Sequence, residues 1–507
     1  MALGGSLRID DVIAISRGAR AYFAPGCRQR IEASRDVVER ALSSGAIVYG
    51  VTTGFGSLAD VRLSPEHASA LQHGLIRSHA VAVGPELSAP EVRAMLALRA
   101  HVLALGCSGV RFEVANRFLE LLAHEILPVV PEQGSLGASG DLAPLAHLAL
   151  GAIGEGRVRV RGGEPVQAAG ALAEAGLAPI RLEAKEGLAL INGTQGMTAI
   201  GVLSAGRARQ LAKTADLAAA VTIEAILGTD RAFDPRVVGL RPHQGQQASA
   251  RNLVRLLAGS DLLASHRESH HIVQDAYSIR CAPQVHGALR DVLRQSIATL
   301  EIELASVSDN PIVLSEDDEI LSCGNFHGQP VAHACDSLAA ALVGLASISE
   351  RRLYRLLDTK TSNGLPAFLV GEAGVNSGFM VCQYTAASLV SESKSLAHPA
   401  TVDSITSSAG QEDHVSMGMI AARHARDCVT NAEAVVAFEL LAAGQALELR
   451  APLRPSPATA AALRALRARV AHLDHDRELK PDVDAAIELV RSGEVLAAVE
   501  AEIGELE

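Results

Sequence analysis

Apolar residues recur with the spacing of an α-helix over most of the second half of the chain. The helix predicted after residue 338 carries on one face the apolar series Leu342, Leu345, Ile348, Leu353 and Leu356. The segments 287–305 and 418–449 favour helix in the same way. Residues 196–227 are Ala-rich, apolar on most faces and followed by Gly228, as expected of an enclosed helix. The pattern predicts a bundle of long helices.

The rest of the chain predicts shorter elements. Residues 10–109 read as short helices separated by Gly and Pro, with the glycine-spaced loop 49–56 between them. The alternating run 157–161 ends at Gly162-Gly163 and predicts a small surface hairpin. A Pro-Ser-Pro break at 455–457 precedes charged, amphipathic helices. We therefore expect a mainly α fold made of a smaller N-terminal domain, a central bundle of long helices and a C-terminal appendage, with the ranges 1–195, 196–453 and 454–507.

Composition agrees with this architecture and excludes several classes of partner. Only 3% of the 507 residues are aromatic and none is Trp, which suits closely packed aliphatic helices. The net charge of −12 argues against a sequence-independent nucleic-acid binder. The seven Cys are scattered and form no CxxC pair, as in a reducing cytoplasm. Residues 1–10 lack a signal pattern, and no run of 18 uninterrupted apolar residues occurs, so we expect a cytoplasmic protein without membrane contact.

Most familiar chemical motifs are missing or weak. Walker, GxGxxG and GxSxG loops do not occur. His266 and His270 would share one face of a helix, if the segment is helical, but no third ligand is identifiable, so we expect a polar helix face and no metal. The glycosylation triplet beginning at Asn192 lies between apolar segments, so we treat it as accidental.

The run Gly134-Ser-Leu-Gly-Ala-Ser-Gly-Asp-Leu-Ala-Pro-Leu145 crowds small residues around Ser139. It could be a structural turn in which Asp141 caps a following helix. It could also present Ser139 as the nucleophile of a serine hydrolase. A third possibility is attack by the unhindered Gly140 nitrogen on the Ala138 carbonyl, which, with loss of water including the Ser139 hydroxyl, leaves an exocyclic methylene. Residue types alone leave all three open.

The third possibility matters because none of the twenty side chains is a strong electrophile. Together with six other blocks, the run resembles the aromatic amino-acid ammonia-lyase and aminomutase family, whose members cyclise Ala-Ser-Gly. The other blocks are Tyr49–Gly56, Leu190–Thr194, Asp275–Arg280, Ser308–Pro311, Gly324–His327 and Gln411–Met417. The resemblance implies that Ala138, Ser139 and Gly140 form 4-methylidene-imidazole-5-one without an external cofactor. It also implies an active site shared between subunits of a homotetramer.

The resemblance also suggests a substrate. Arg77-Ser-His-Ala80 and Gln411-Glu412 are similar to the family members that convert L-histidine to trans-urocanate and ammonia. An imidazole offers a donor and an acceptor, which His79 and Glu412 could satisfy, whereas a phenyl ring would leave Glu412 buried and unpaired. Three positions depart from that pattern: Ala282, Gln329 and Gly410. Because Asn325-Phe-His-Gly-Gln329 also resembles tyrosine aminomutases, a tyrosine 2,3-aminomutase or tyrosine ammonia-lyase remains the alternative.

The resemblance assigns roles to further residues. Tyr49 would remove the β-proton, which requires surroundings that lower its phenol pKa from the usual value of about 10. Arg280 would hold the substrate carboxylate with its two-pronged guanidinium. The remaining expected contacts are Asn192 and Tyr277 near the amine and the prosthetic ring, Gln274 on the carboxylate side, and Phe326 as an aromatic wall.

Overall fold

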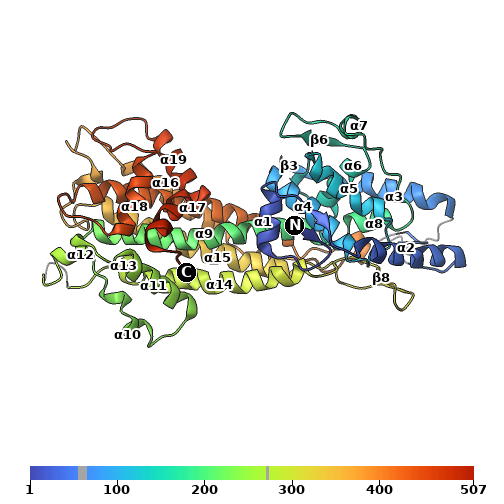
Figure 1. The fold of residues 1–507 in the computed structure, drawn as a ribbon, viewed down its shortest axis with the longest axis horizontal. Coiled ribbons are helices and arrows are strands. Elements are labelled where there is room, and N and C mark those ends of the chain that lie inside the picture. The colour runs from blue at the N-terminus through green and yellow to red at the C-terminus, as the bar shows by residue number, and fades with distance from the viewer. Residues whose placement is uncertain (49, 55–64, 270–272) are drawn as a thin grey trace. The chain divides into compact units, whose positions relative to one another are not determined.

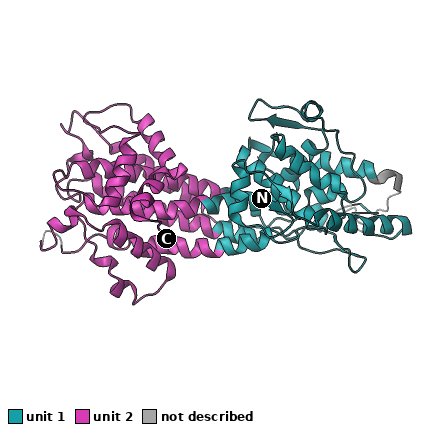
Figure 2. Cartoon of the chain, in the orientation of Figure 1, with its two compact units in different colours: residues 1–206, 296–336, 399–423 teal, residues 207–295, 337–398, 424–507 magenta. Residues whose placement is uncertain are grey.

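Helices dominate the computed structural model, which describes residues 1–48, 50–54, 65–269 and 273–507 (Figure 1). The predictions of a mainly α fold and of long helices are confirmed. The chain divides into two compact units built from interleaved segments (Figure 2). Unit 1 comprises residues 1–206, 296–336 and 399–423, and unit 2 comprises residues 207–295, 337–398 and 424–507. The three-domain division at residues 195 and 453 stays a prediction.

Four long helices contain the borders between the units. They are α9 (Gln195–Ala225), α14 (Ala282–Leu304), α15 (Gln329–Leu357) and α17 (Gly418–Glu448). Small apolar residues such as Ala218, Ala219 and Ala442 are buried in their unit 2 parts. Small side chains let helix backbones approach closely, so an aromatic-poor chain can still fill a bundle core.

Buried charges join these helices within unit 2. Arg352 of α15 pairs with Glu439 of α17 at 2.6 Å, and both side chains are fully buried. His286 of α14 contacts Asp216 of α9 at 2.7 Å, also fully buried. The Arg352 Nη1 donates 3.3 Å to the His286 Nε2, so this imidazole nitrogen acts as an acceptor and the ring is neutral. Burial lowers the His286 pKa, in agreement with a neutral ring.

The other helices of unit 2 are shorter. They are α10 (Pro235–Val238), α11 (Gln244–Leu256), α12 (Asp261–Ser265), α13 (Tyr277–Arg280), α16 (Met380–Leu396), α18 (Pro457–Arg467), α19 (Lys480–Ser492) and α20 (Glu494–Ile503). The short helices expected after residue 454 are thus confirmed. The helix expected to end at Gly228 does end nearby, but the residue with left-handed φ is Leu227, at 55°.

Unit 1 carries the short strands and the loops between them. Its helices are α1 (Ile9–Ser16), α2 (Cys27–Ser44), α3 (Pro65–His79), α4 (Ala89–Ala104), α5 (Phe112–Ala123), α6 (Leu142–Ala152), α7 (Ala168–Glu174) and α8 (Glu186–Ile191). With 18 residues in α2 and 16 in α4, the prediction of only short helices before residue 109 is wrong. Alanine and arginine favour helix strongly enough to extend these segments.

The described strands form four small sheets. Strand β6 (Arg157–Val160) pairs antiparallel with β7 (Val166–Gln167), which confirms the hairpin, and also with β4 (Ile126–Pro128). Strand β3 (Val83–Glu86) pairs with β5 (Pro131–Gln133), and β8 (Ile312–Leu314) pairs with β9 (Glu319–Leu321). The fourth sheet joins β1 (Ala2–Leu3) to β2 (Tyr22–Phe23) in parallel. The β3–β5 pair brings the chain after α3 beside the Ala138-Ser139-Gly140 segment.

Among the described residues, α15 is long and apolar enough to cross a membrane by length and composition alone. The core helix of a soluble protein passes the same test, and 56% of its most apolar window is buried within the fold.

Candidate active site

The Ala138-Ser139-Gly140 tripeptide lies between β5 and α6 in unit 1. Ser139 and Gly140 both have left-handed φ, at 51° and 79°, and Gly137 has φ of 91°. These angles turn the chain back on itself, so that Gly137 and Gly140 form an isolated antiparallel bridge. A left-handed φ at a non-glycine residue is unfavourable by about 1–2 kcal/mol, so Ser139 is strained.

A second backbone segment fixes the tripeptide from the other side. The Gly193 N–H donates to the Ser139 carbonyl at 3.1 Å, and the Asp141 N–H donates to the Gly193 carbonyl at 2.8 Å. A Cβ on Gly140 would collide with the Gly193 carbonyl. Only glycine therefore fits at position 140, and its backbone nitrogen is free of side-chain obstruction.

Asp141 occupies the N-cap position of α6, but its side chain does not cap that helix. Instead its Oδ2 accepts a hydrogen bond from the Met197 N–H at 2.8 Å, in the first turn of α9. The Ser135 hydroxyl donates to the Asp141 Oδ1 at 3.2 Å. Burial raises the pKa of this carboxyl to about 7. Of the three possibilities left open for this run, the side-chain cap of α6 by Asp141 is therefore not formed, because the side chain turns toward the N–H groups in the first turn of α9.

Segments distant in the sequence pack against this loop. The Met417 N–H donates to the Leu136 carbonyl at 3.0 Å. A Cβ on Gly328 would collide with Met197 and lie 3.3 Å from the Ser416 hydroxyl. Met417, at the end of the Gln411–Met417 block, therefore contacts the loop directly, and the segment that follows Phe326 lies against Ser416. The two segments also contact each other, since the His327 Nε2 lies 3.2 Å from the His414 carbonyl oxygen.

Glu412 has an unsatisfied buried atom. Its backbone carbonyl accepts from the Ser407 N–H at 2.9 Å, which fixes the turn. Its side-chain Oε2 is buried and has no hydrogen-bond partner among the described residues. A buried carboxylate oxygen without a partner is costly, so this atom is available for a donor brought by a ligand.

His79 is the last residue of α3, and one nitrogen of its imidazole ring can accept a hydrogen bond. Its Nδ1 lies 2.8 Å from the Leu75 carbonyl oxygen, which can only accept, so Nδ1 carries a hydrogen and Nε2 is an acceptor in the neutral ring. Burial lowers the His79 pKa and so favours that neutral form.

The segment after His79 is held by a histidine that the motif analysis missed. The Ala82 N–H donates to the His147 Nε2 at 3.2 Å. Ala82 also packs against the tripeptide loop, since a Cβ on Gly134 would lie 3.1 Å from its Cα. The only sequence signal for His147 is its place on the helix that follows the tripeptide.

Asn192 is fully buried beside Gly193, so the interpretation of its glycosylation triplet as accidental agrees with the structure. Its Nδ2 donates to the Asp309 Oδ1 at 3.0 Å and to the Asn310 carbonyl at 2.9 Å. Its Oδ1 is buried and has no partner among the described residues. Asp309 pairs in turn with Lys185 at 3.0 Å, and both side chains are fully buried. Sequence reasoning assigned no role to Asp309 or Lys185.

Three further expected residues lie together in unit 2. The Arg280 guanidinium carbon is 4.5 Å from the centroid of the Tyr277 ring on the same short helix, α13. The Arg280 Nε donates to the Asp275 carbonyl at 3.0 Å. The Gln274 amide faces the same guanidinium and, with its oxygen turned toward it, accepts from Nη1 at 2.8 Å. Tyr49, the remaining expected residue, lies outside the described residues.

The three departures from the histidine-type pattern occupy different surroundings. Ala282 is fully buried at the start of α14. Gln329 begins α15, where its Nε2 lies 3.2 Å from the His333 Nε2 and its Oε1 is buried without a partner among the described residues. Gly410 has φ of 93° with open space where a Cβ would point.

The helix expected around His266 is not formed. Helix α12 ends at Ser265, and the His266 Nε2 lies 2.9 Å from the Gly228 carbonyl oxygen instead. His270 lies outside the described residues. No group of three or more potential metal ligands occurs within the described part of the chain.

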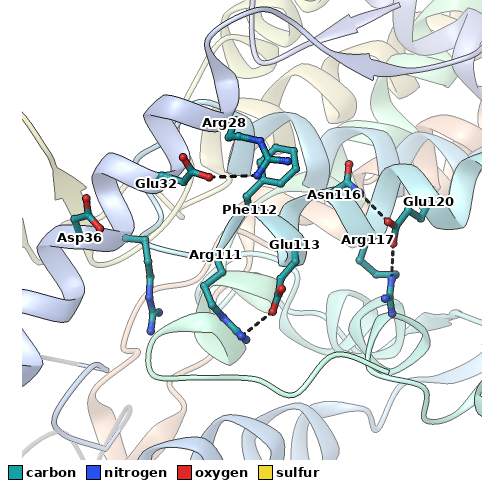
Figure 3. Close-up of a pocket in the computed structure, with 10 residues that line it drawn as sticks. Arg28, Glu32, Asp36, Arg111, Phe112, Glu113, Asn116, Arg117 and Glu120 are labelled. Atoms are coloured by element: carbon teal, nitrogen blue, oxygen red, sulfur yellow. Dashed lines mark hydrogen bonds and ion pairs between the residues drawn. The ribbon is translucent and has the colours of Figure 1, made fainter. Parts of the chain in front are cut away.

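A charged pocket of about 520 Å³ lies between α2 and α5 (Figure 3). Arg28 lies over the Phe112 ring at 3.5 Å and pairs with Glu32, while Arg111 pairs with Glu113 at 2.7 Å. Because its four arginines are all paired with carboxylates, the pocket offers no excess charge of either sign. None of the expected site residues lines it, so it is not the candidate active site.

Comparison with known proteins identifies the class. The family model described as aromatic amino acid lyase matches residues 7–468. The chain belongs to this family and is a carbon–nitrogen lyase.

Individual relatives are similar over their full length. A curated histidine ammonia-lyase of Symbiobacterium thermophilum is 54% identical, covering 100% of this chain and 99% of the relative. The solved histidine ammonia-lyase of Trypanosoma cruzi is 42% identical with a TM-score of 0.92, covering 99% of this chain and 96% of the other. The solved tyrosine aminomutase of Streptomyces globisporus is 38% identical with a TM-score of 0.94, covering 100% of both chains.

Proposed function

We propose that this chain is a histidine ammonia-lyase, which converts L-histidine to trans-urocanate and ammonia. The full-length identity of 54% to a histidine ammonia-lyase carries the proposal. The polar character of His79 and Glu412 supports it, because each offers an acceptor atom to a ring whose two nitrogens carry one hydrogen in the neutral form and two in the protonated form.

We propose that Ala138, Ser139 and Gly140 cyclise to 4-methylidene-imidazole-5-one, with no external cofactor. The backbone fits this change, since Ser139 and Gly140 already turn back toward Gly137 and the Gly140 nitrogen has no side chain beside it. Cyclisation joins the Gly140 nitrogen to the Ala138 carbonyl carbon and expels two water molecules, one of which contains the Ser139 oxygen. The group then supplies an electrophile for the substrate amine.

The chain's own side chains bind and orient the substrate in this proposal. Arg280 forms a two-pronged contact with the carboxylate, and Gln274 and Tyr277 flank that guanidinium. Phe326 provides an aromatic wall. Tyr49 removes the β-proton, so its surroundings must favour the phenolate.

The proposed contacts with the imidazole ring of the substrate determine which of its nitrogens carry a hydrogen. The neutral His79 Nε2 accepts from one ring N–H of the substrate. In this proposal the other ring nitrogen lies beside the Glu412 Oε2, which is buried without a partner among the described residues, and a hydrogen must lie between these two acceptor atoms. A tyrosine side chain has a single hydroxyl and would satisfy only one of these two groups.

Two alternative functions would involve a different substrate or a different reaction. The high similarity to a tyrosine aminomutase structure, and the Gln329 departure, favour tyrosine as the second candidate substrate. A serine hydrolase using Ser139 is disfavoured, because the chain matches the aromatic amino acid lyase family over residues 7–468.

The deciding experiment incubates the purified protein with L-histidine and, separately, with L-tyrosine. Ultraviolet absorbance is followed for urocanate and coumarate, and chromatography detects β-tyrosine. We expect urocanate from histidine. Coumarate or β-tyrosine with untouched histidine would replace the proposal with the tyrosine alternative.

We further propose a cytoplasmic homotetramer with shared active sites. The similarity to the family supports this assembly. Size-exclusion chromatography with light scattering should give four chains per particle, and a monomer at working concentration would contradict it.

A further inference from the structure

The side-chain amide of Asn192 is held in one orientation. Its Nδ2 donates to two oxygen atoms that can only accept, the Asp309 carboxylate at 3.0 Å and the Asn310 carbonyl at 2.9 Å. Rotating the amide by half a turn would place its Oδ1 against both acceptors. The present orientation is therefore strongly favoured, and Asn192 offers its oxygen, not its nitrogen, to any ligand.

A fully buried ion pair maintains this arrangement. The Asp309 Oδ2 accepts from the Lys185 ammonium at 3.0 Å, while its Oδ1 accepts from Asn192 and, at 2.7 Å, from the Asn310 N–H. A lone buried carboxylate is unfavourable, so Lys185 supplies the counter-charge that lets Asp309 stay in this position. Burial lowers the Lys185 pKa, although the Asp309 charge opposes that change.

Because Asn192 offers its side-chain oxygen, it can bind only a group that donates a hydrogen bond. Asn192 directly precedes Gly193, whose N–H holds the Ser139 carbonyl at 3.1 Å. The Asn192 Oδ1 is buried without a partner among the described residues, so a ligand that binds it must supply a hydrogen-bond donor. A ring made from Ala138 to Gly140 has no N–H, because cyclisation consumes the hydrogens of both nitrogens. A substrate carboxylate is likewise only an acceptor.

We infer that Asn192 accepts a hydrogen bond from the substrate's amino group, and that Asp309, neutralised by Lys185, is the positioning residue that fixes this orientation. The inference rests on the proposed function, because it takes an α-amino acid as substrate. It predicts that Asp309 affects recognition of the amine and leaves recognition of the carboxylate and ring unchanged.

Two matched double variants separate the positioning of the Asn192 amide by Asp309 from the effect of the buried charges. Lys185→Met/Asp309→Asn removes both buried charges but keeps an oxygen acceptor, which two donors, the Asn192 Nδ2 and the Asn310 N–H, hold in place. Lys185→Met/Asp309→Leu removes the same charges and the acceptor, with a side chain of similar size. Both variants remove the Asp309 charge that acts on the buried Arg99, so any effect of that loss is common to the two and does not enter their comparison.

Binding is measured by calorimetry in a Ser139→Ala background, which prevents turnover. The ligands are L-histidine and imidazole-4-propionate, which lacks only the amino group. The Asp309→Leu double variant should bind L-histidine roughly tenfold more weakly than the Asp309→Asn double variant, with the propionate affinity alike in both. Asn192→Ala, which leaves the ion pair intact, should reproduce that selective loss.

The inference is overturned if the two double variants bind L-histidine equally, or if Asn192→Ala weakens both ligands to the same extent. Failure of the proposed function gives a different result, because the wild-type protein would then leave histidine untouched. If tyrosine is turned over instead, the same comparison with L-tyrosine and 3-(4-hydroxyphenyl)propionate tests the inference without change.

Discussion

Asp141 joins the tripeptide to a long helix through Met197, whose N–H donates to its Oδ2 at 2.8 Å. Through this contact the residue after Gly140 closes the first turn of α9. The same carboxyl is fully buried, and its pKa is raised from 3.8 to about 7 by that burial. Its ionisation is therefore linked to stability.

The Asp141 pKa predicts a specific pH dependence. Between about pH 4 and pH 7 the folded state holds this proton and the unfolded chain does not, so stability falls as pH rises through that window and is level above it. Asp141→Asn removes the titration but keeps an acceptor for Met197. The urea midpoint of the wild type, relative to Asp141→Asn, should therefore be lower at about pH 8 than at about pH 5. An unchanged difference would show that Asp141 does not titrate there.

Gly140→Ala should prevent formation of the prosthetic group. The added Cβ collides with the Gly193 carbonyl and disturbs the loop that must cyclise. We expect the intact mass to retain both water molecules and kcat to fall about a hundredfold or more. Gly162→Ala is the matched control, because Gly162 also has positive φ, 73°, but open space around it. Equal activity losses in the two variants would contradict the steric explanation.

His147 is expected to position the segment that carries His79. His147→Leu removes the acceptor of the Ala82 N–H, so this backbone donor loses its partner and the loop shifts. KM for histidine should rise roughly three- to tenfold with kcat little changed. His147→Gln can place an oxygen near the former Nε2 and should restore most of the affinity. A glutamine variant no better than leucine would refute this positioning role.

Arg280→Lys tests the proposed carboxylate contact. Lysine keeps the charge but loses the planar two-pronged donor and the stacking on Tyr277. We expect kcat/KM for histidine to fall about ten- to a hundredfold. Arg236→Lys, an exposed arginine of the same unit that pairs with Asp234, should leave kcat/KM unchanged. Near-wild-type activity of Arg280→Lys would show that Arg280 does not bind the substrate carboxylate in the proposed two-pronged way.

The long helices could be predicted because their hydrophobic pattern is local. Residues 196–227 and 418–449 bury small apolar side chains at helical spacing, and the observed bounds of α9 and α17 differ from these ranges by at most two residues. Whether the segment after Ser265 is helical could not be predicted for a tertiary reason, since His266 contacts the Gly228 carbonyl where α12 ends.

The candidate site could be proposed where residues form short motifs. Ala138, Ser139 and Gly140 stand out because small residues cluster there. Asp309 lies in the Ser308–Pro311 block, but its role, like those of Lys185 and His147, could not be predicted, because their partners lie 65 to 124 positions away in the sequence. The acceptor of the Met197 N–H likewise lies outside its own helix, so local capping rules assigned Asp141 to α6.

The most direct test is the intact mass of catalytically active, purified protein. Chemistry through a self-formed electrophile predicts a mass lower by two water molecules than the sequence requires, with the loss confined to a peptide that contains residues 138–140. Active protein at the full mass of the uncyclised chain would contradict the account.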